Sequence, residues 1–405
     1  FDGNVKIDGA ITIDTDVSST ANDGKIDFGT NTINAANTGS DTESLTLQSG
    51  SGVITLGTIG VSQPLDALSI NASDSAAAAI TLKRIGSFAG TAGVVGTTTI
   101  GNASTASIDL NAAQFNFGGA TTIDAAGDIT TDADINITTD ENLTITPGQT
   151  SGDFKITGDF DLVASTSNDT ITIAGNIVGV DSGGTSNETV TITAGASSGT
   201  DGGTIVMGGS IGTEVESVAL KAGTLVKLGG DITTVNVSNN DVTITGAAQI
   251  TADVDINVTA NATGTHEGDI TFTSTINDDG SGTASNLILD ADGGAISVTG
   301  AIGATNALGT LTINNADTAH DGTITLAGIG NTAAGATTTN IGNSSTAALN
   351  LAGTFFTGGD TTYESKAGEF IEITDTTTIK TGASAGHDIT FQTGEIDIAD
   401  TKNLT

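Results

Sequence analysis

The sequence predicts an all-β protein, a parallel β-helix (β-solenoid) in which about three short strands make each coil of roughly 26–28 residues. Three observations lead to this prediction. The chain repeats itself at long range, short apolar pairs recur at a regular spacing, and the composition favours strands and turns over helices. Fixed-period self-similarity is typical of repeat architectures, in which each unit buries its apolar face against its neighbours.

The long-range repeat relates residues 1–119 to residues 249–359, about 240 positions further on. Its longest near-identity pairs residues 100–106 (IGNASTA) with residues 341–347 (IGNSSTA). The stretch 150–248 repeats less regularly, and we expect a third, partial copy over 373–405. We therefore interpret 1–405 as one continuous solenoid segment, either a piece of a longer repetitive polypeptide or a chain whose ends meet the next copy.

A shorter spacing within each copy predicts the coils. Ile26, Ile54 and Ile80 follow one another at intervals of about 27 residues, and two further apolar pairs lie between consecutive anchors. Alternate side chains of a strand point to opposite faces, so in a segment such as Ile-Thr-Leu the apolar residues face inward and the threonine outward. The predicted inward rows comprise Ile26, Phe28, Leu45, Leu47, Ile54, Leu56, Ile270, Phe272, Leu287, Leu289, Ile296 and Ile324.

The composition fits short strands joined by tight turns. β-Branched residues suit a pleated, half-buried surface, while the 56 glycines and the many Asn, Asp and Ser residues supply turns. An array of antiparallel β-sandwich domains is the alternative, because Asp-Gly pairs such as Asp23-Gly24 and Asp321-Gly322 could form two-residue hairpin turns. Several of these pairs precede the same strand type at coil-like spacing, which favours the solenoid.

The charge excludes several classes of partner. The formal net charge is -37, and Arg84 is the sole arginine, so binding to nucleic acid through clustered basic residues is not expected. The sequence has no apolar run long enough to cross a bilayer, so we expect no membrane insertion. It has no cysteine and therefore no disulfide framework.

Acidic residues at the predicted turns are candidates for cation binding. The pairs Asp14 and Asp16, Asp253 and Asp255, and Asp290 and Asp292 would be brought close by stacked coils, and Ca²⁺ prefers oxygen ligands. Solvated acidic turns that bind no ion are the alternative. Calcium is the one cofactor that we consider for this chain.

No catalytic site is predicted. His266, His320 and His387 each occupy the turn before a core strand, a place that repeat equivalence explains without chemistry. The sequence has no zinc-ligand motif and no nucleophile elbow, and with no tryptophan and one tyrosine it is poorly equipped to stack on sugars. Among the Asn-x-Ser/Thr sequons, Asn136 and Asn257 match between the copies and are candidate glycosylation sites.

Residues 45–56 and 286–296 carry a resemblance to a known family. Each has a short aliphatic strand, a turn of small residues with Gly, and another strand. This pattern resembles the repeat of filamentous-haemagglutinin-type surface adhesins, and the resemblance implies a secreted, repetitive β-helix of the bacterial surface. We expect a structural extracellular protein of a surface fibre, sheath or layer that associates with itself through solenoid ends or edges. The alternatives are a cell-surface adhesin with a cell-surface or glycan ligand and, more remotely, a carbohydrate-active β-helix enzyme.

Overall fold

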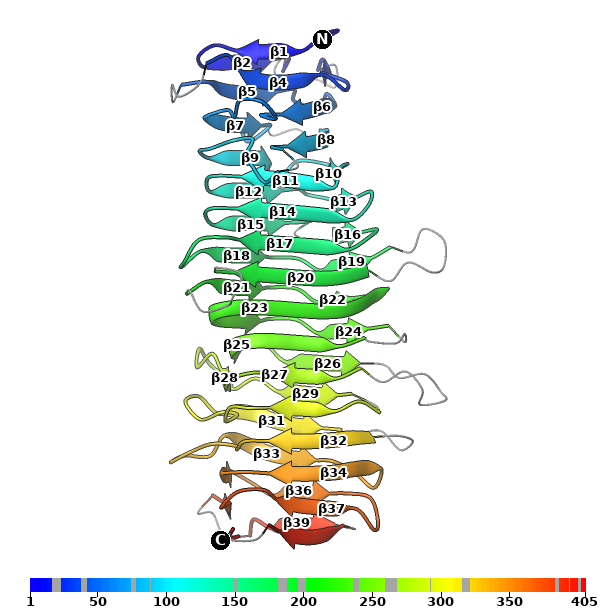
Figure 1. The fold of residues 1–405 in the computed structure, drawn as a ribbon, viewed down its shortest axis with the longest axis vertical. Helices are drawn as coiled ribbons and strands as arrows, with labels where there is room; N and C mark the ends of the chain where they lie inside the picture. The colour runs from blue at the N-terminus through cyan, green and yellow to red at the C-terminus, as the bar shows by residue number, and fades with distance from the viewer. Residues whose placement is uncertain are drawn as a thin grey trace. The chain divides into compact units, whose positions relative to one another are not determined.

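The computed structural model describes β-strands and no helix, so no described segment forms a helix that could span a membrane. The described residues are 1–16, 23–37, 42–73, 78–87, 89–148, 152–180, 188–195, 202–235, 240–258, 268–291, 293–314, 321–382, 386–392, 394–399 and 402–405. The chain divides into two compact units, Phe1–Gly209 (unit 1) and Ser210–Thr405 (unit 2). Each unit is a parallel β-solenoid with three faces, whose strands are stacked in Figure 1.

The strands of unit 1 form three columns. Face A contains β3 (Ile26–Asp27), β6 (Ile54–Ile59), β8 (Ala79–Ile85), β10 (Ser107–Leu110), β13 (Ile129–Thr131), β16 (Phe154–Ile156) and β19 (Ile177–Gly179). Face B contains β1 (Val5–Ile7), β4 (Thr32–Ala35), the second halves of β6 and β8, β11 (Gln114–Phe117), β14 (Ile135–Thr139), β17 (Phe160–Ala164) and β20 (Glu188–Ala194). Face C contains β2 (Ile11–Asp14), β5 (Ser44–Gln48), β7 (Ala67–Ile70), β9 (Thr98–Gly101), β12 (Thr121–Asp124), β15 (Leu143–Thr146), β18 (Thr170–Ile173) and β21 (Thr204–Met207).

Unit 2 also has three columns, and each takes the letter of the column that its repeat counterpart forms in unit 1. Its face A contains β27 (Ile270–Phe272), β30 (Ile296–Val298), β32 (Asp321–Leu326), β34 (Thr346–Leu351), β37 (Phe370–Ile373) and β40 (Glu395–Ile398). Its face B contains β28 (Ile276–Asp278), β35 (Thr354–Thr357) and β38 (Thr378–Thr381), and β23 (Val215–Leu228) and β25 (Val242–Ile250) each span faces A and B. Its face C contains β22 (Ile211–Gly212), β24 (Ile232–Thr234), β26 (Val254–Val258), β29 (Leu287–Asp290), β31 (Leu308–Ile313), β33 (Ala336–Ile341), β36 (Thr361–Glu364) and β39 (Ile389–Gln392).

The strand pairing confirms the predicted parallel register. Ile26 pairs with Ile54, and Ile54 pairs with Ile80, as the anchor spacing requires. The second copy is built in the same way, with Ile296 paired to both Ile270 and Ile324. The pairings between described strands within each unit are parallel, so the antiparallel sandwich alternative is wrong for these residues.

The coil length varies more than the anchors suggest. Ile108 pairs with Ile129 after a short coil, whereas Ile11 pairs with Leu45 after a much longer one. The strands must stay in register along the ladder, but the corner loops can lengthen or shorten without disturbing it. The predicted coil length therefore describes the anchor positions rather than every coil.

The interior of each unit is aliphatic, as predicted. Each of the twelve residues assigned to the inward rows is buried. Threonine replaces an aliphatic residue at a few inward positions: Thr98 pairs with Thr121 in unit 1, and Thr339 pairs with Thr361 in unit 2. These replacements lie at matching places in the two copies. The two copies therefore share the same pattern of aliphatic and threonine residues in the core.

The two long copies lie in different units. Residues 1–119 belong to unit 1 and residues 249–359 to unit 2. The correspondence between the two copies continues past residue 359. In unit 2, β39 pairs with β36, just as β15 pairs with β12 in unit 1. The interpretation of 1–405 as one continuous segment, and of 373–405 as a third copy, stays a prediction.

Candidate functional site

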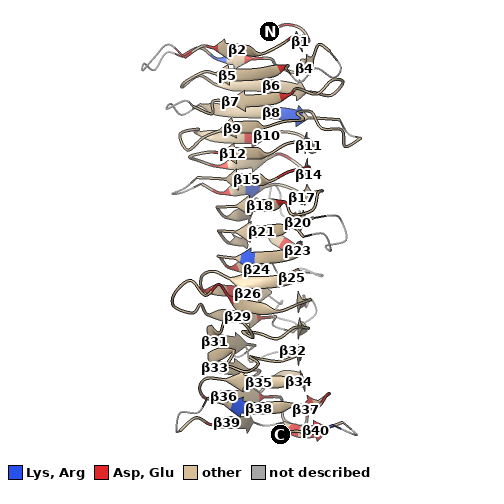
Figure 2. Ribbon diagram, turned by 90° about the vertical axis from the view of Figure 1, so that its left-hand side faces the viewer, with Lys and Arg blue, Asp and Glu red and all other residues tan. Residues whose placement is uncertain are grey.

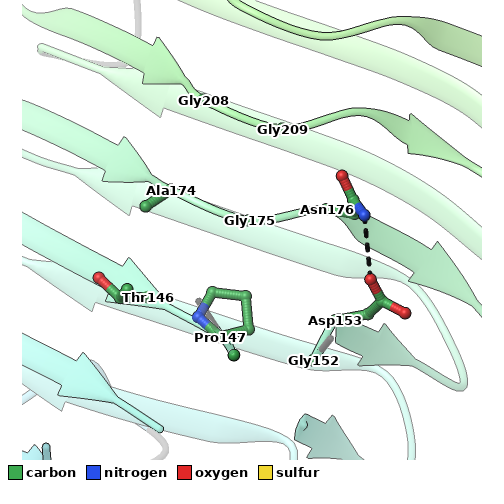
Figure 3. Close-up of a pocket in the computed structure, with 10 residues that line it drawn as sticks. Thr146, Pro147, Gly152, Asp153, Ala174, Gly175, Asn176, Gly208 and Gly209 are labelled. Atoms are coloured by element: carbon green, nitrogen blue, oxygen red, sulfur yellow. Dashed lines mark hydrogen bonds between the residues drawn. The ribbon is translucent and has the colours of Figure 1, made fainter. Parts of the chain in front are cut away.

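A corner recess in unit 1, where face C turns into face A, is the first candidate site. It has a volume of about 560 Å³ and crosses three successive coils. Its lining consists of Thr146, Pro147, Gly148, Gly152, Asp153, Ala174, Gly175, Asn176, Gly208 and Gly209, nine of which are labelled in Figure 3. Small residues make the recess: a Cβ on Gly175 would lie 2.6 Å from the ring of Pro147, too close for any other residue without movement.

The polar groups of this corner are bonded to one another. The Asn176 side-chain amide donates to Asp153 Oδ1 at 3.0 Å, and the Asp153 backbone N–H donates to Asp128 Oδ1 at 3.0 Å. Lys155 Nζ lies 2.6 Å from Asp128 Oδ2. Burial alone would raise the pKa of Asp128, but its hydrogen bonds with Lys155 and the Asp153 backbone outweigh burial and hold that pKa below its usual value.

The recess can hold a hydroxyl-bearing ligand but offers little chemistry. Asp153 is the one titratable side chain among the described residues that line it. A carboxylate beside an amide could bind a sugar hydroxyl, whereas acid–base catalysis on a glycosidic bond needs a pair of carboxyl groups. This geometry therefore suits binding better than catalysis.

A second recess, of about 580 Å³, lies on face C of unit 2. It is lined by β22 and its turn and by the β24 segment, and it carries the carboxylates of Glu214 and Asp231. Thr213 and Glu214 both have positive φ angles, of 51° and 64°, which is unusual for residues with a Cβ. The turn that closes this recess is thus held in a strained shape.

The predicted calcium ligands that the structure describes lie in two separate places, one in each unit. In unit 1, Asp14 Oδ1 accepts the backbone N–H of Asp16 at 2.9 Å, a local turn at the end of β2. In unit 2, Asp253 Oδ1 accepts the backbone N–H of Asn286 at 2.8 Å. Asp292 is not among the described residues.

Asp255 is a predicted ligand that lies near two further carboxylates, those of Asp231 and Asp290. Its backbone N–H donates to Asp231 Oδ1 at 2.9 Å. Burial, followed by repulsion from Asp231 and Asp290, raises the pKa of the Asp255 carboxyl. Within the described residues, no three His, Cys, Asp or Glu side chains are grouped as ligands for one ion. Calcium binding stays a prediction.

The acidic corner residues have a structural role that the sequence did not reveal. A carboxylate just before one strand accepts the backbone N–H of the next coil, as Asp134 does for Asp159 and Asp159 does for Thr189. Asp241 and Asp269 form the same chain in unit 2. Because each such bond satisfies an N–H at the beginning of a strand, these side chains continue the backbone ladder around the corner.

Sequence reasoning also missed an asparagine pair that occurs once in each copy, in which Asn71 and Asn314 are buried. Asn71 Oδ1 accepts the Ser49 backbone N–H at 2.9 Å, and the Asn102 side chain donates to the Asn71 carbonyl at 2.6 Å. Asn314 and Asn343 make the equivalent bonds in unit 2, at 2.9 and 2.7 Å. The near-identity at residues 100–106 and 341–347 was the available signal, and these bonds explain it.

The remaining candidates are dispersed. His387 Nδ1 lies 3.4 Å from Asp360 Oδ1, while His266 and His320 lie outside the described residues. Asn136 is half-buried on face B, paired with Gln114 and Asp161 on the neighbouring coils. The other candidate for glycosylation, Asn257, is half-buried on face C of unit 2 and pairs with Asp290. Glycan at either position stays a prediction.

Comparison of the chain with protein-family models, with curated proteins and with solved structures found no match. The class of protein is therefore defined by its geometry alone: a parallel β-solenoid repeat protein with aliphatic interiors and acidic corners. The resemblance to filamentous-haemagglutinin-type adhesins stays a prediction.

Proposed function

We propose that the chain is a structural extracellular protein, part of a surface fibre, sheath or layer, and that it associates with further copies of itself through the open turns of its solenoid units. The observation that supports this proposal most is the uncovered turn formed by β39 and β40 in unit 2. Its inward-pointing side chains are those that a further coil would bury.

The register identifies these side chains as part of the core. Ile396 and Ile398 pair with Ile371 and Ile373, which are fully buried, so all four belong to the same inward rows. Ile396 and Ile398 are nevertheless 44% and 43% exposed. Ile389, which pairs with the buried Thr361, is also uncovered.

The first turn of unit 1 offers a complementary surface. Ile11 pairs with the buried Leu45 yet is 39% exposed, because no described strand of unit 1 covers β2 on its other side. Both turns present unpaired backbone groups together with apolar side chains, and such strand edges pair readily with other chains.

A lysine pair at the open turn is expected to weaken this association. The double substitution Ile396→Lys and Ile398→Lys would place two charges where a neighbouring coil must pack, so the variant should remain monomeric at concentrations at which the parent chain forms longer particles. Sedimentation velocity over a concentration series, with electron microscopy of the same samples, measures this.

Ile288→Lys is the matched control. Ile288 is 38% exposed but points outward from the middle of face C in unit 2, so its replacement should leave association unchanged. The proposal is contradicted if the parent chain is monomeric at every concentration, or if the control disrupts the particles as strongly as the double variant does.

A further inference from the structure

Face C of unit 1 carries an unbroken row of hydroxyl side chains. Successive register pairings join one residue from each of the first seven strands of the face: Thr12, Thr46, Ser69, Thr99, Thr122, Thr144 and Thr172. Val206 on β21 ends the row. From β5 onward these positions alternate with buried ones in their strands, so the side chains point outward. The strands that bear them, β5 to β18, are stacked in one column in Figure 2.

The hydroxyls of this row are not used by the fold. None of the seven hydrogen-bonds to another group in the part of the chain that the structure describes. The row also contains no charged residue, although the chain has 47 carboxylates. A neutral, periodic row of unused donors and acceptors, flanked on face C by Asp14 and Asp124, fits an uncharged partner that itself repeats along the solenoid axis.

The spacing of the row identifies such a partner. Parallel strands lie about 4.8 Å apart, so the seven hydroxyls form an array about 29 Å long. In ice, each water oxygen has tetrahedral neighbours at about 2.75 Å. Two oxygens that are bonded to the same third oxygen are therefore about 4.5 Å apart. The two repeats are close enough for successive hydroxyls to occupy successive lattice positions over several coils.

The choice of threonine supports the same partner. Its two branches restrict χ1, so a row of threonines presents hydroxyl and methyl groups in a fixed order. A flexible or aromatic row would suit a sugar polymer better, and no aromatic residue interrupts this row. We propose that face C of unit 1 is a surface that binds ice.

Two other outward rows in the described strands are interrupted. The outward row of face A in unit 1 includes Asp27, Asp109 and Lys155. The equivalent row of face C in unit 2 is broken by Asp255, Ile288 and Asn340. The preference of strands for threonine therefore does not by itself produce an unbroken row, and these faces provide internal controls.

Lysine substitutions within the row test the proposal. The full chain should adsorb to a growing ice surface and lower the temperature at which a seeded crystal grows, as measured by partition into an ice hemisphere and by nanolitre osmometry. Thr99→Lys with Thr144→Lys should abolish both effects, because each side chain is too long and too strongly hydrated for the lattice. Thr55→Lys with Thr81→Lys, which changes the outward row of face A, should preserve both effects.

Three results would overturn the assignment: a parent chain that does not adsorb to ice, equal loss in both double variants, or full activity in the face C variant with an unchanged circular dichroism spectrum. Binding to insoluble cellulose or chitin in the absence of ice adsorption would assign the row to a polysaccharide instead. The outcome is independent of end-to-end association, because the β39–β40 turn is unaltered in every variant.

Discussion

Replacing Leu289 by alanine is expected to lower the free energy of unfolding by about 3 kcal/mol. Leu289 is fully buried in β29, between Ile256 on one neighbouring coil and Ile313 on the other. The substitution removes apolar contacts and leaves a cavity that a continuous ladder cannot easily close. Urea unfolding followed by circular dichroism measures the loss.

The neighbouring residue is the control for this substitution. Ile288 lies on the same strand but points outward and is 38% exposed, so Ile288→Ala should change stability by no more than about 0.5 kcal/mol. A similar loss for both variants would contradict the alternation of inward and outward residues on which the solenoid depends.

Asn71→Ala is expected to cost about 2–4 kcal/mol, the second large effect. Asn71 is 1% exposed and has a φ of 45°, a backbone conformation that asparagine adopts more readily than alanine. Its side chain also accepts the N–H of the fully buried Ser49, which the substitution would leave without a partner. Urea unfolding gives the total, and hydrogen exchange at the Ser49 amide reports the lost bond.

Glycine at the same position separates the two contributions. Asn71→Gly tolerates the positive φ but still loses the side-chain hydrogen bond, so it should be less damaging than alanine. In unit 2, Asn314→Ala should reproduce the effect, because Asn314 has a φ of 41° and accepts the N–H of the buried Ala291. Alanine variants as stable as the parent chain would show that the asparagine pair does not stabilise the fold.

Periodicity made the fold predictable, because a parallel ladder forces equivalent apolar residues into equivalent places. Ile26, Ile54 and Ile80 are register partners, as their spacing indicated. The coil lengths elsewhere were not predictable, since corner loops vary without any effect on the register, as between Ile11 and Leu45.

The roles of polar residues were harder to anticipate, because a carboxylate that binds an ion and one that accepts a backbone N–H look alike in a sequence. Asp253 was a candidate ligand, and in the structure it accepts the N–H of Asn286 from the next coil. Asn102 stood within the longest match between the copies, but only the fold shows that it bonds to Asn71. The hydroxyl row likewise emerges only once the register is known, since its members are separated by whole coils of unequal length.

Disulfide cross-linking tests the parallel stacking of coils most directly, because the chain has no cysteine of its own. Thr122 and Thr144 are register partners on adjacent coils of face C, about 4.8 Å apart, within the range that a disulfide can bridge. We expect Thr122→Cys with Thr144→Cys to close on mild oxidation, and Thr122→Cys with Thr172→Cys, two coils apart, to stay open. Closure of Thr122→Cys with Thr130→Cys, as a hairpin would allow, while the Thr122–Thr144 pair stays open, would contradict the solenoid.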